Sequence, residues 1–97
     1  MRVGTVRSVE PFPEARKDVY RLEVDFGEAT RQSAAGLTDN YTEAELGGRQ
    51  VVAVVNLGTV NIAGFESQCL VVGVDDAEGD VVHLQPEREV PDGTRVY

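Results

Sequence analysis

Apolar and polar residues alternate along much of the chain with the two-residue period of β-strands. The alternation is most regular over residues 19–26, because successive side chains of a strand point to opposite faces. Its apolar positions are Tyr20, Leu22, Val24 and Phe26, and its charged positions are Arg21, Glu23 and Asp25. We therefore predict a strand over 19–26 with one buried face.

Two neighbouring segments are predicted to be strands from shorter patterns. Valines spaced among polar residues from Arg2 to Glu10 predict a first strand, with Gly4 at a bend or bulge. A tight turn at 27–29 allows the small and polar residues from Thr30 to Ala35 to pair back as a third strand.

The second half of the chain begins with a strand of a different kind. Val51 to Val55 is apolar without alternation, which predicts a strand buried on both faces. The segment 57–65 carries two glycines and is predicted to be a loop. The remaining elements are predicted strands at 67–74 and 81–84, and predicted turns at 75–79 and 91–93.

One short helix is predicted between the third and fourth strands. Thr42 can cap the amide of Glu45 while the Glu45 side chain returns to Thr42, and Tyr41 can pack on Leu46 as a hydrophobic staple. The glycines at 47–48 supply a left-handed exit. Short strands, frequent turns and one helix together predict an all-β fold with a closed barrel and a C-terminal β extension.

Length and composition indicate one small globular domain over residues 1–97. The longest apolar run has five residues, far short of the ~20 that span a bilayer, so no membrane partner is expected. No secretory pattern opens the chain, and we expect a cytoplasmic protein. The single cysteine, Cys69, lies between apolar neighbours and is expected to be a buried core residue.

The charge balance is strongly acidic, with 17 carboxylates against nine basic side chains and a net charge of −8. Such a chain should repel nucleic acid. Lys17 is the only lysine beside eight arginines, a composition that suggests a halophilic source. In concentrated salt the repulsion would be screened and counterion release would weaken, leaving stacking, shape and hydrogen bonds as the basis of binding.

No arrangement typical of an enzyme is visible in the sequence. His83 lies in a predicted strand and is expected to face solvent rather than act as a base. The acidic residues around Gly79 lack the spacing of a calcium loop and are expected to form a polar hairpin turn. We therefore expect no catalytic residue, no metal site and no cofactor.

Three motifs occur in an order seen in one family: Gln32-Ser33-Ala34-Ala35-Gly36-Leu37-Thr38, then Val51 to Leu57, then Ile62-Ala63-Gly64-Phe65-Glu66-Ser67. On these motifs the chain resembles the tRNA-binding domain of the CsaA type. That domain is related to the C-terminal tRNA-binding module of some methionyl-tRNA synthetases and to endothelial-monocyte-activating polypeptide. The resemblance implies a five-stranded OB-fold barrel with its helix between strands 3 and 4.

The resemblance also implies a non-catalytic tRNA-binding protein that forms a homodimer. Two alternatives stay open: a chaperone or export-related protein that binds unfolded or exported polypeptides in apolar grooves, and a docking module for an aminoacyl-tRNA synthetase. Charge reversal at Arg16 and Lys17 should weaken tRNA binding and leave the chaperone activity unchanged.

OB-folds bind oligonucleotides on the face of their second and third strands and on the flanking loops. This placement predicts a basic patch of Arg16, Lys17, Arg21 and Arg31. From composition alone, ion pairs with Glu14, Asp18, Glu23 and Asp25 are the favoured alternative. The resemblance adds polar groove positions at Ser33, Asn56, Asn61 and Ser67, while Phe65 is expected in the core more often than at a base.

Overall fold

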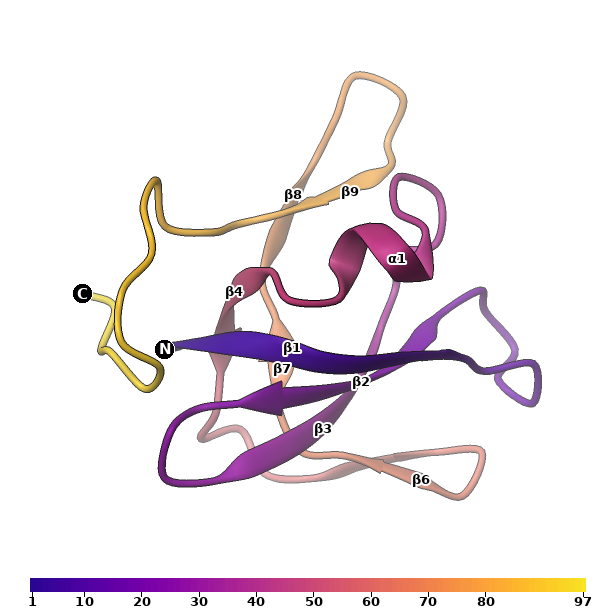
Figure 1. Cartoon of the computed structure of the whole chain (residues 1–97). Coiled ribbons are helices and arrows are strands. Elements are labelled where there is room, and N and C mark those ends of the chain that lie inside the picture. Colours follow the sequence, from indigo (N-terminus) through magenta and orange to yellow (C-terminus); the bar gives the residue numbers. More distant parts are fainter.

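The computed structural model describes all 97 residues as a nearly closed antiparallel barrel (Figure 1). Five strands form one sheet in the order β3-β2-β1-β4-β7. Their bounds are β1 Arg2–Pro11, β2 Tyr20–Asp25, β3 Thr30–Ala35, β4 Gln50–Val54 and β7 Leu70–Val71. The predicted positions of the first four barrel strands and the OB-like barrel are confirmed. The pairing of β1 with β2 is irregular between Val6 and Ser8, so a bulge lies there and not at Gly4.

The barrel interior is filled by the apolar face that the alternation predicts. Leu22, Val24 and Val6 are 1% exposed or less, and Val51 and Ala53 of β4 meet them from the other side. Val52 of β4 is 8% exposed although it points outward. The backbone amide of Val52 donates to the carbonyl oxygen of Leu84, so the C-terminal segment lies beside β4 at this position.

The helix α1, Glu43–Leu46, closes one end of the barrel with Leu46, which is fully buried. The capping box forms as predicted: the Glu45 amide donates to the Thr42 hydroxyl at 3.2 Å, and the Thr42 amide donates to the Glu45 carboxylate at 2.9 Å. Gly48 adopts the left-handed conformation that ends the segment, with φ 86°. No helix of the chain is long or apolar enough to cross a membrane.

Gly4 allows close packing inside the barrel. A Cβ atom at this position would lie 2.6 Å from Cγ1 of Val24 and 2.8 Å from the ring of Phe26. The missing side chain therefore lets the Phe26 ring, 7% exposed, fill the end of the barrel opposite α1.

The barrel seam between β3 and the chain leading into β7 is closed largely by side chains. The Ser33 hydroxyl donates to the Cys69 carbonyl at 2.8 Å, and the Ala34 amide donates to the Ser67 hydroxyl at 3.1 Å. The Gln68 amide donates to the Gln32 carbonyl at 2.8 Å. Side-chain hydroxyls thus replace ladder hydrogen bonds where these strands diverge.

The predicted loop over 57–65 is wrong in part, because it contains a β-hairpin. Strands β5, Val60–Ile62, and β6, Phe65–Ser67, pair antiparallel. Ala63 and Gly64 both have positive φ, the geometry of a type I′ turn that matches strand twist. The predicted strand 67–74 is correspondingly divided among β6, β7 and the next strand.

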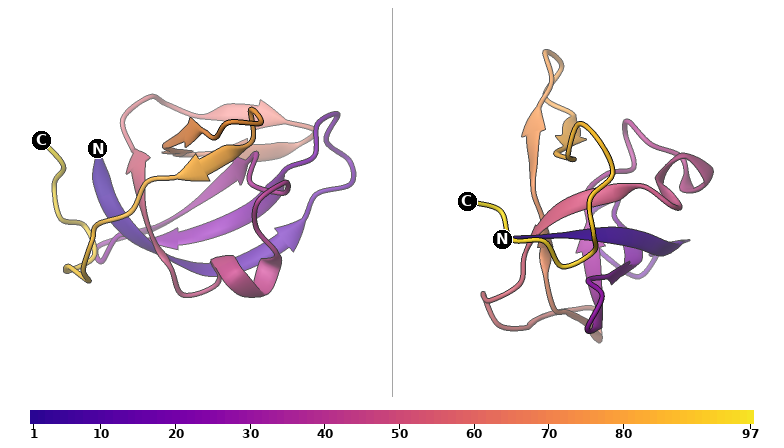
Figure 2. Two further views of the ribbon diagram at one scale, coloured as in Figure 1. Left: turned by 90° about the horizontal axis from the view of Figure 1, so that it is seen from above. Right: turned by 60° about the vertical axis from the view of Figure 1, so that its left-hand side comes forward.

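A second hairpin stands away from the barrel (Figure 2) and is formed by β8, Gly73–Asp75, and β9, Val81–His83. The prediction that His83 faces solvent is wrong, since it is 5% exposed and its ring centre lies 5.0 Å from that of Tyr41. Because side chains alternate, Val82 and Leu84 then point outward and are 36% and 39% exposed. The tail crosses back to β1, with the Val96 amide bonded to the Met1 carbonyl.

Candidate nucleic-acid interface

Two loops project on the same side of the barrel and flank the outer face of β2 and β3 (Figure 1). One is the connection 12–19 between β1 and β2, and the other is the β5–β6 hairpin. Depressions of about 220 Å³ and about 460 Å³ lie along this side. We call this surface, from Arg16 across Arg21 to Asn61, the groove.

An arginine packed on two aromatic rings forms the centre of the groove. The Phe12 and Phe65 rings meet edge to face with centroids 5.4 Å apart. The guanidinium carbon of Arg21 lies 5.3 Å from the Phe12 centroid and 6.0 Å from the Phe65 centroid. Phe12 is buried, whereas Phe65 is half-buried and lines the smaller depression, so the core expectation for Phe65 holds only in part.

Arg21 also forms an ion pair within the groove. Its Nη2 atom lies 2.9 Å from Oε2 of Glu10, which is its direct partner in the β1–β2 ladder. The Nε atom of Arg21 is buried and has no hydrogen-bond acceptor. Such unpartnered buried donors are rare in folded proteins.

The larger depression carries the predicted loop cations. Arg16 and Lys17 line it together with Asn61 and Ile62 of the β5–β6 hairpin. Both basic side chains are exposed, and neither forms an ion pair in the structure. The Asn61 side-chain carbonyl accepts a bond from the Gly64 amide at 3.1 Å, which holds the hairpin turn. The structure therefore brings Arg16, Lys17 and Asn61 together as predicted.

Arg31 does not join this patch. It shares its face of β3 with the inward residues Ser33 and Ala35, whereas Arg21 points outward from β2. Arg31 lines a separate pocket of about 340 Å³ with Arg2 at the barrel end that Phe26 fills. The expectation of a single patch containing both arginines is therefore wrong, because they occupy opposite faces of one curved sheet.

Three of the polar positions inferred from the resemblance, Ser33, Asn56 and Ser67, do not lie together in the groove. Ser33 is fully buried and Ser67 is 9% exposed, and both hydroxyls belong to the barrel seam. Both hydroxyls make hydrogen bonds at strand ends and do not belong to the groove. Asn56 is exposed in the chain just after β4 and makes no side-chain hydrogen bond.

None of the ion pairs expected as the alternative to a basic patch is present. Asp25 does pair, but with Arg7 at 3.2 Å, and Arg7 also approaches Asp92 at 3.5 Å. Sequence reasoning missed Arg7, because its carboxylate partners come from β2 and the distant tail. The pKa of Asp25 is lowered, first by the hydrogen bond from the Gly27 amide and then by Arg7.

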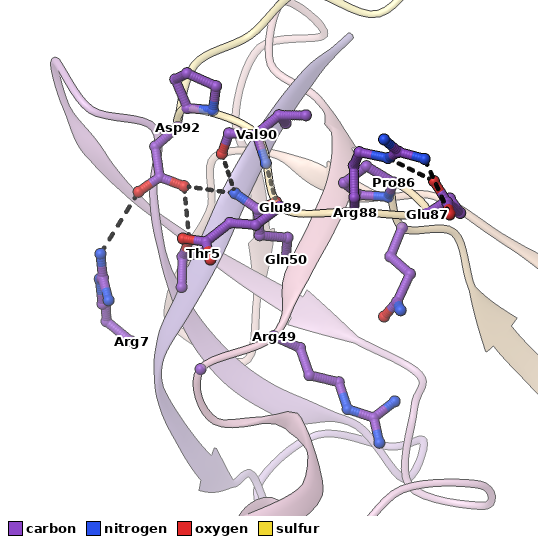
Figure 3. Close-up of a pocket in the computed structure, with 13 residues that line it drawn as sticks. Thr5, Arg7, Arg49, Gln50, Pro86, Glu87, Arg88, Glu89, Val90 and Asp92 are labelled. Carbon is purple, nitrogen blue, oxygen red and sulfur yellow. Dashed lines mark hydrogen bonds and ion pairs between the residues drawn. The ribbon is translucent and has the colours of Figure 1, made fainter.

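The largest pocket, about 580 Å³, lies between β1, the start of β4 and the tail (Figure 3). Asp92 accepts several of the hydrogen bonds in this pocket: the Thr5 hydroxyl donates to its carboxylate at 2.6 Å, and the side-chain amide of Gln50 donates at 3.3 Å. Arg88 is neutralised by its neighbour Glu87 at 2.8 Å. The polar groups of this pocket therefore mainly bond the C-terminal tail to the barrel.

The remaining reactive or acidic groups have structural roles. Burial raises the pKa of the Cys69 thiol, which disfavours the reactive thiolate. The Asp76 carboxylate accepts bonds from the amides of Glu78 and Asp80 and from the Asn40 side chain, which lowers its pKa. The acidic cluster of Asp76, Glu78 and Asp80 is thus a hairpin turn, as predicted.

Comparison with solved structures places the chain beside chaperones. It superposes on the chaperone CsaA of Bacillus anthracis with a TM-score of 0.92 and 48% identity, covering 99% of this chain and 88% of that one. The CsaA chaperone of Picrophilus torridus gives 0.91 and 37%, with 99% and 89% covered. A MetRS-related protein of Pyrococcus horikoshii gives 0.87 and 33%, with 99% and 87% covered.

Sequence comparison adds a second group of relatives. The methionine–tRNA ligase of Methanosarcina acetivorans is 40% identical over 97 residues, which is 99% of this chain and 14% of the ligase. The ligase of Methanothrix thermoacetophila is 46% identical over 93 residues, 96% of this chain and 14% of the ligase. The chain thus spans about a seventh of these relatives. The family described as "Putative tRNA binding domain" matches residues 1–95, and the chain belongs to this tRNA-binding domain family.

Proposed function

We propose that this chain is a non-catalytic protein that binds tRNA in the groove. The observation that carries the proposal is the cluster of Arg21, Phe12 and Phe65 beside the unpaired cations Arg16 and Lys17. Family membership supports tRNA as the ligand. The groove also lies on the strands and loops that OB-folds use for oligonucleotides.

The groove supplies two kinds of contact to a single-stranded part of the RNA. Arg16 and Lys17 offer charged donors to phosphate oxygens, which position the strand without reading its sequence. Phe65 and the Arg21 guanidinium offer flat surfaces on which an unpaired base can stack, worth ~1–3 kcal/mol per base. This combination suits a looped or terminal segment of tRNA better than a duplex.

Charge reversal of the two loop cations tests the proposal. The double variant Arg16→Glu and Lys17→Glu should lower tRNA retention in a filter assay by at least tenfold, because two phosphate contacts are lost and two repulsions added. The matched control, Arg88→Glu and Arg95→Glu, changes the net charge equally at the tail. Equal losses in both variants would show that only total charge matters and would count against the groove.

The exposed apolar face supports a homodimer as part of this proposal. Val74 and Val82 are direct partners in the β8–β9 ladder, and Leu70 and Leu84 continue the same face. These four side chains are 36% to 54% exposed. A second copy of the chain is the proposed occupant, because an isologous contact would bury the same ladder on both subunits. Val74→Lys should then shift the mass measured by light scattering from dimer to monomer.

A chaperone activity is the second candidate, and the CsaA neighbours favour it. The same apolar face would then hold extended segments of unfolded or exported polypeptides, and the chain would suppress aggregation of a denatured client. That activity should be lost in Val74→Lys and retained in the Arg16 and Lys17 double variant. Docking to an aminoacyl-tRNA synthetase is a third proposal, which co-purification from the native cell would test.

A further inference from the structure

The Arg21 guanidinium group at the centre of the groove already forms an ion pair with a carboxylate of the same molecule. Glu10 and Arg21 are cross-strand partners on β1 and β2, and their side chains form an ion pair at 2.9 Å. Directly opposed residues of opposite charge on one sheet face attract each other. The pair is therefore fixed by the strand register, and it lies where an RNA phosphate would approach Arg21.

This ion pair leaves the guanidinium group partly unused. Only Nη2 of Arg21 contacts Glu10, while Nε is buried without an acceptor. Arginine binds carboxylate and phosphate most strongly through two parallel N–H bonds. A phosphate that engages Nε and Nη2 together would supply the bond that Glu10 does not. The Phe12 and Phe65 rings support the guanidinium plane during such an exchange.

We propose that Glu10 is an internal competitor of RNA phosphate at Arg21. The Glu10–Arg21 pair must open before a phosphate can occupy the bidentate position at Nε and Nη2, so Glu10 lowers the tRNA affinity of the groove. This inference rests on the proposed tRNA-binding function and assigns a regulatory contact to the same site. Glu10 thereby makes the groove selective for ligands that offer more than one acceptor to Arg21.

The exchange also alters the salt dependence of binding. At Arg21 one anion replaces another, so this contact releases little counterion on binding. Without the carboxylate, Arg21 becomes one additional cation that neutralises a phosphate. Each such contact changes the slope of log affinity against log salt by about 0.7 to 0.9. Glu10 should therefore flatten the response of tRNA affinity to salt.

The test is Glu10→Gln, with tRNA affinity measured from about 0.05 M to about 1 M potassium chloride, a range over which screening becomes strong. We expect affinity at the lowest salt to rise about two- to fivefold, the range of an exposed ion pair. We expect the salt slope to steepen by about 0.7 to 0.9. Glu87→Gln is the matched control, because it removes an arginine-paired carboxylate from the tail. Equal gains in both variants would overturn the inference.

Two further measurements separate this inference from the proposed function. Glu10→Gln should have no effect beyond the Glu87→Gln control in an Arg21→Ala background; a further gain there would overturn the inference. The Arg21 Nε–H signal should respond to inorganic phosphate at about two- to fivefold lower concentration in Glu10→Gln than in the native protein. Equal midpoints would overturn the inference even if no variant binds tRNA, a result that would itself refute the proposed function.

Discussion

The guanidinium group of Arg21 lies over the ring of Phe12, with 5.3 Å between the guanidinium carbon and the ring centroid. Arg21 belongs to β2, whereas Phe12 begins the connection from β1, so the contact joins a loop to the sheet. Phe12 is 5% exposed and therefore holds a fixed position. The result is a charged group whose orientation is set before any ligand arrives, which lowers the entropy cost of binding.

Arg21→Lys tests whether the planar group matters beyond its charge. Lysine keeps the charge but lacks the planar guanidinium group and cannot donate two parallel bonds. We expect tRNA affinity to fall about two- to fivefold, which corresponds to the ~0.5–1 kcal/mol of an exposed cation–π contact. Arg88→Lys in the tail is the control and should leave affinity unchanged. Equal tRNA affinity of Arg21→Lys and the native protein would show that the contact of the guanidinium group with Phe12 does not contribute to binding.

Ser33→Ala distinguishes a barrel residue from an RNA contact. The hydroxyl of Ser33 is fully buried and donates to the Cys69 carbonyl at 2.8 Å, so its loss leaves that buried acceptor with only the longer bond from the Ser67 hydroxyl at 3.4 Å. We expect the free energy of unfolding in urea to fall by ~1–3 kcal/mol. tRNA affinity of the folded variant should be unchanged. A variant of native stability with weakened tRNA affinity would show instead that Ser33 contributes to RNA binding.

Gly4→Ala tests the packing at the barrel end that Phe26 fills. The added methyl group would approach Val24 and the Phe26 ring at 2.6 and 2.8 Å, so the core must shift. We expect the free energy of unfolding to fall by ~1–3 kcal/mol. Gly36→Ala is the matched control, because nothing lies within 4 Å of its Cβ position and its φ is not positive. It should change stability by less than ~1 kcal/mol.

His83 should make the stability of the protein depend on pH. Burial lowers the pKa of His83 below its ordinary value of 6.5, so the unfolded chain binds the proton more readily than the folded chain. The contribution is fully present above about pH 6.5 and is lost as the pH falls from there through the folded pKa. The slope reaches at most ~1.4 kcal/mol per pH unit.

The variant His83→Phe isolates this effect. A phenyl ring retains a stacking surface for Tyr41 but loses the hydrogen bond between Nδ1 of His83 and the Leu84 carbonyl at 3.2 Å, so the test compares how stability changes with pH and not its absolute value. Urea unfolding between pH 7 and pH 5 should show a smaller decline in stability than in the native protein. The lowered pKa of Asp76 changes stability only below the ordinary aspartate pKa of 3.8, which lies outside this interval. Parallel curves for the two proteins would exclude His83 as the titrating group.

The parts of the fold that local chemistry decides could be predicted from the sequence. Thr42 and Glu45 satisfy each other within one helical turn, and the alternation around Leu22 identifies the buried face of β2. His83 and Ser33 could not be placed in this way, because their surroundings come from distant segments. His83 packs on Tyr41 and Ser33 bonds to Cys69, and neither contact leaves a periodic signal.

The candidate site was predictable to a similar degree. The loop cations Arg16 and Lys17 were identified because the OB-fold fixes which connection carries them. The separation of Arg31 from Arg21 depends on strand register, which sets the face of each side chain. Glu10 could not be identified from the sequence, because one carboxylate in an acidic chain has no distinguishing pattern. Only the β1–β2 register shows that it lies opposite Arg21.

The most direct test of the groove is backbone amide mapping by nuclear magnetic resonance during addition of tRNA. We predict that the largest changes fall on the connection around Arg16 and Lys17, on Arg21 of β2, and on the hairpin at Asn61. Changes concentrated instead around Thr5, Arg49 and Arg88, or along the apolar ladder from Val74 to Leu84, would contradict the proposed interface.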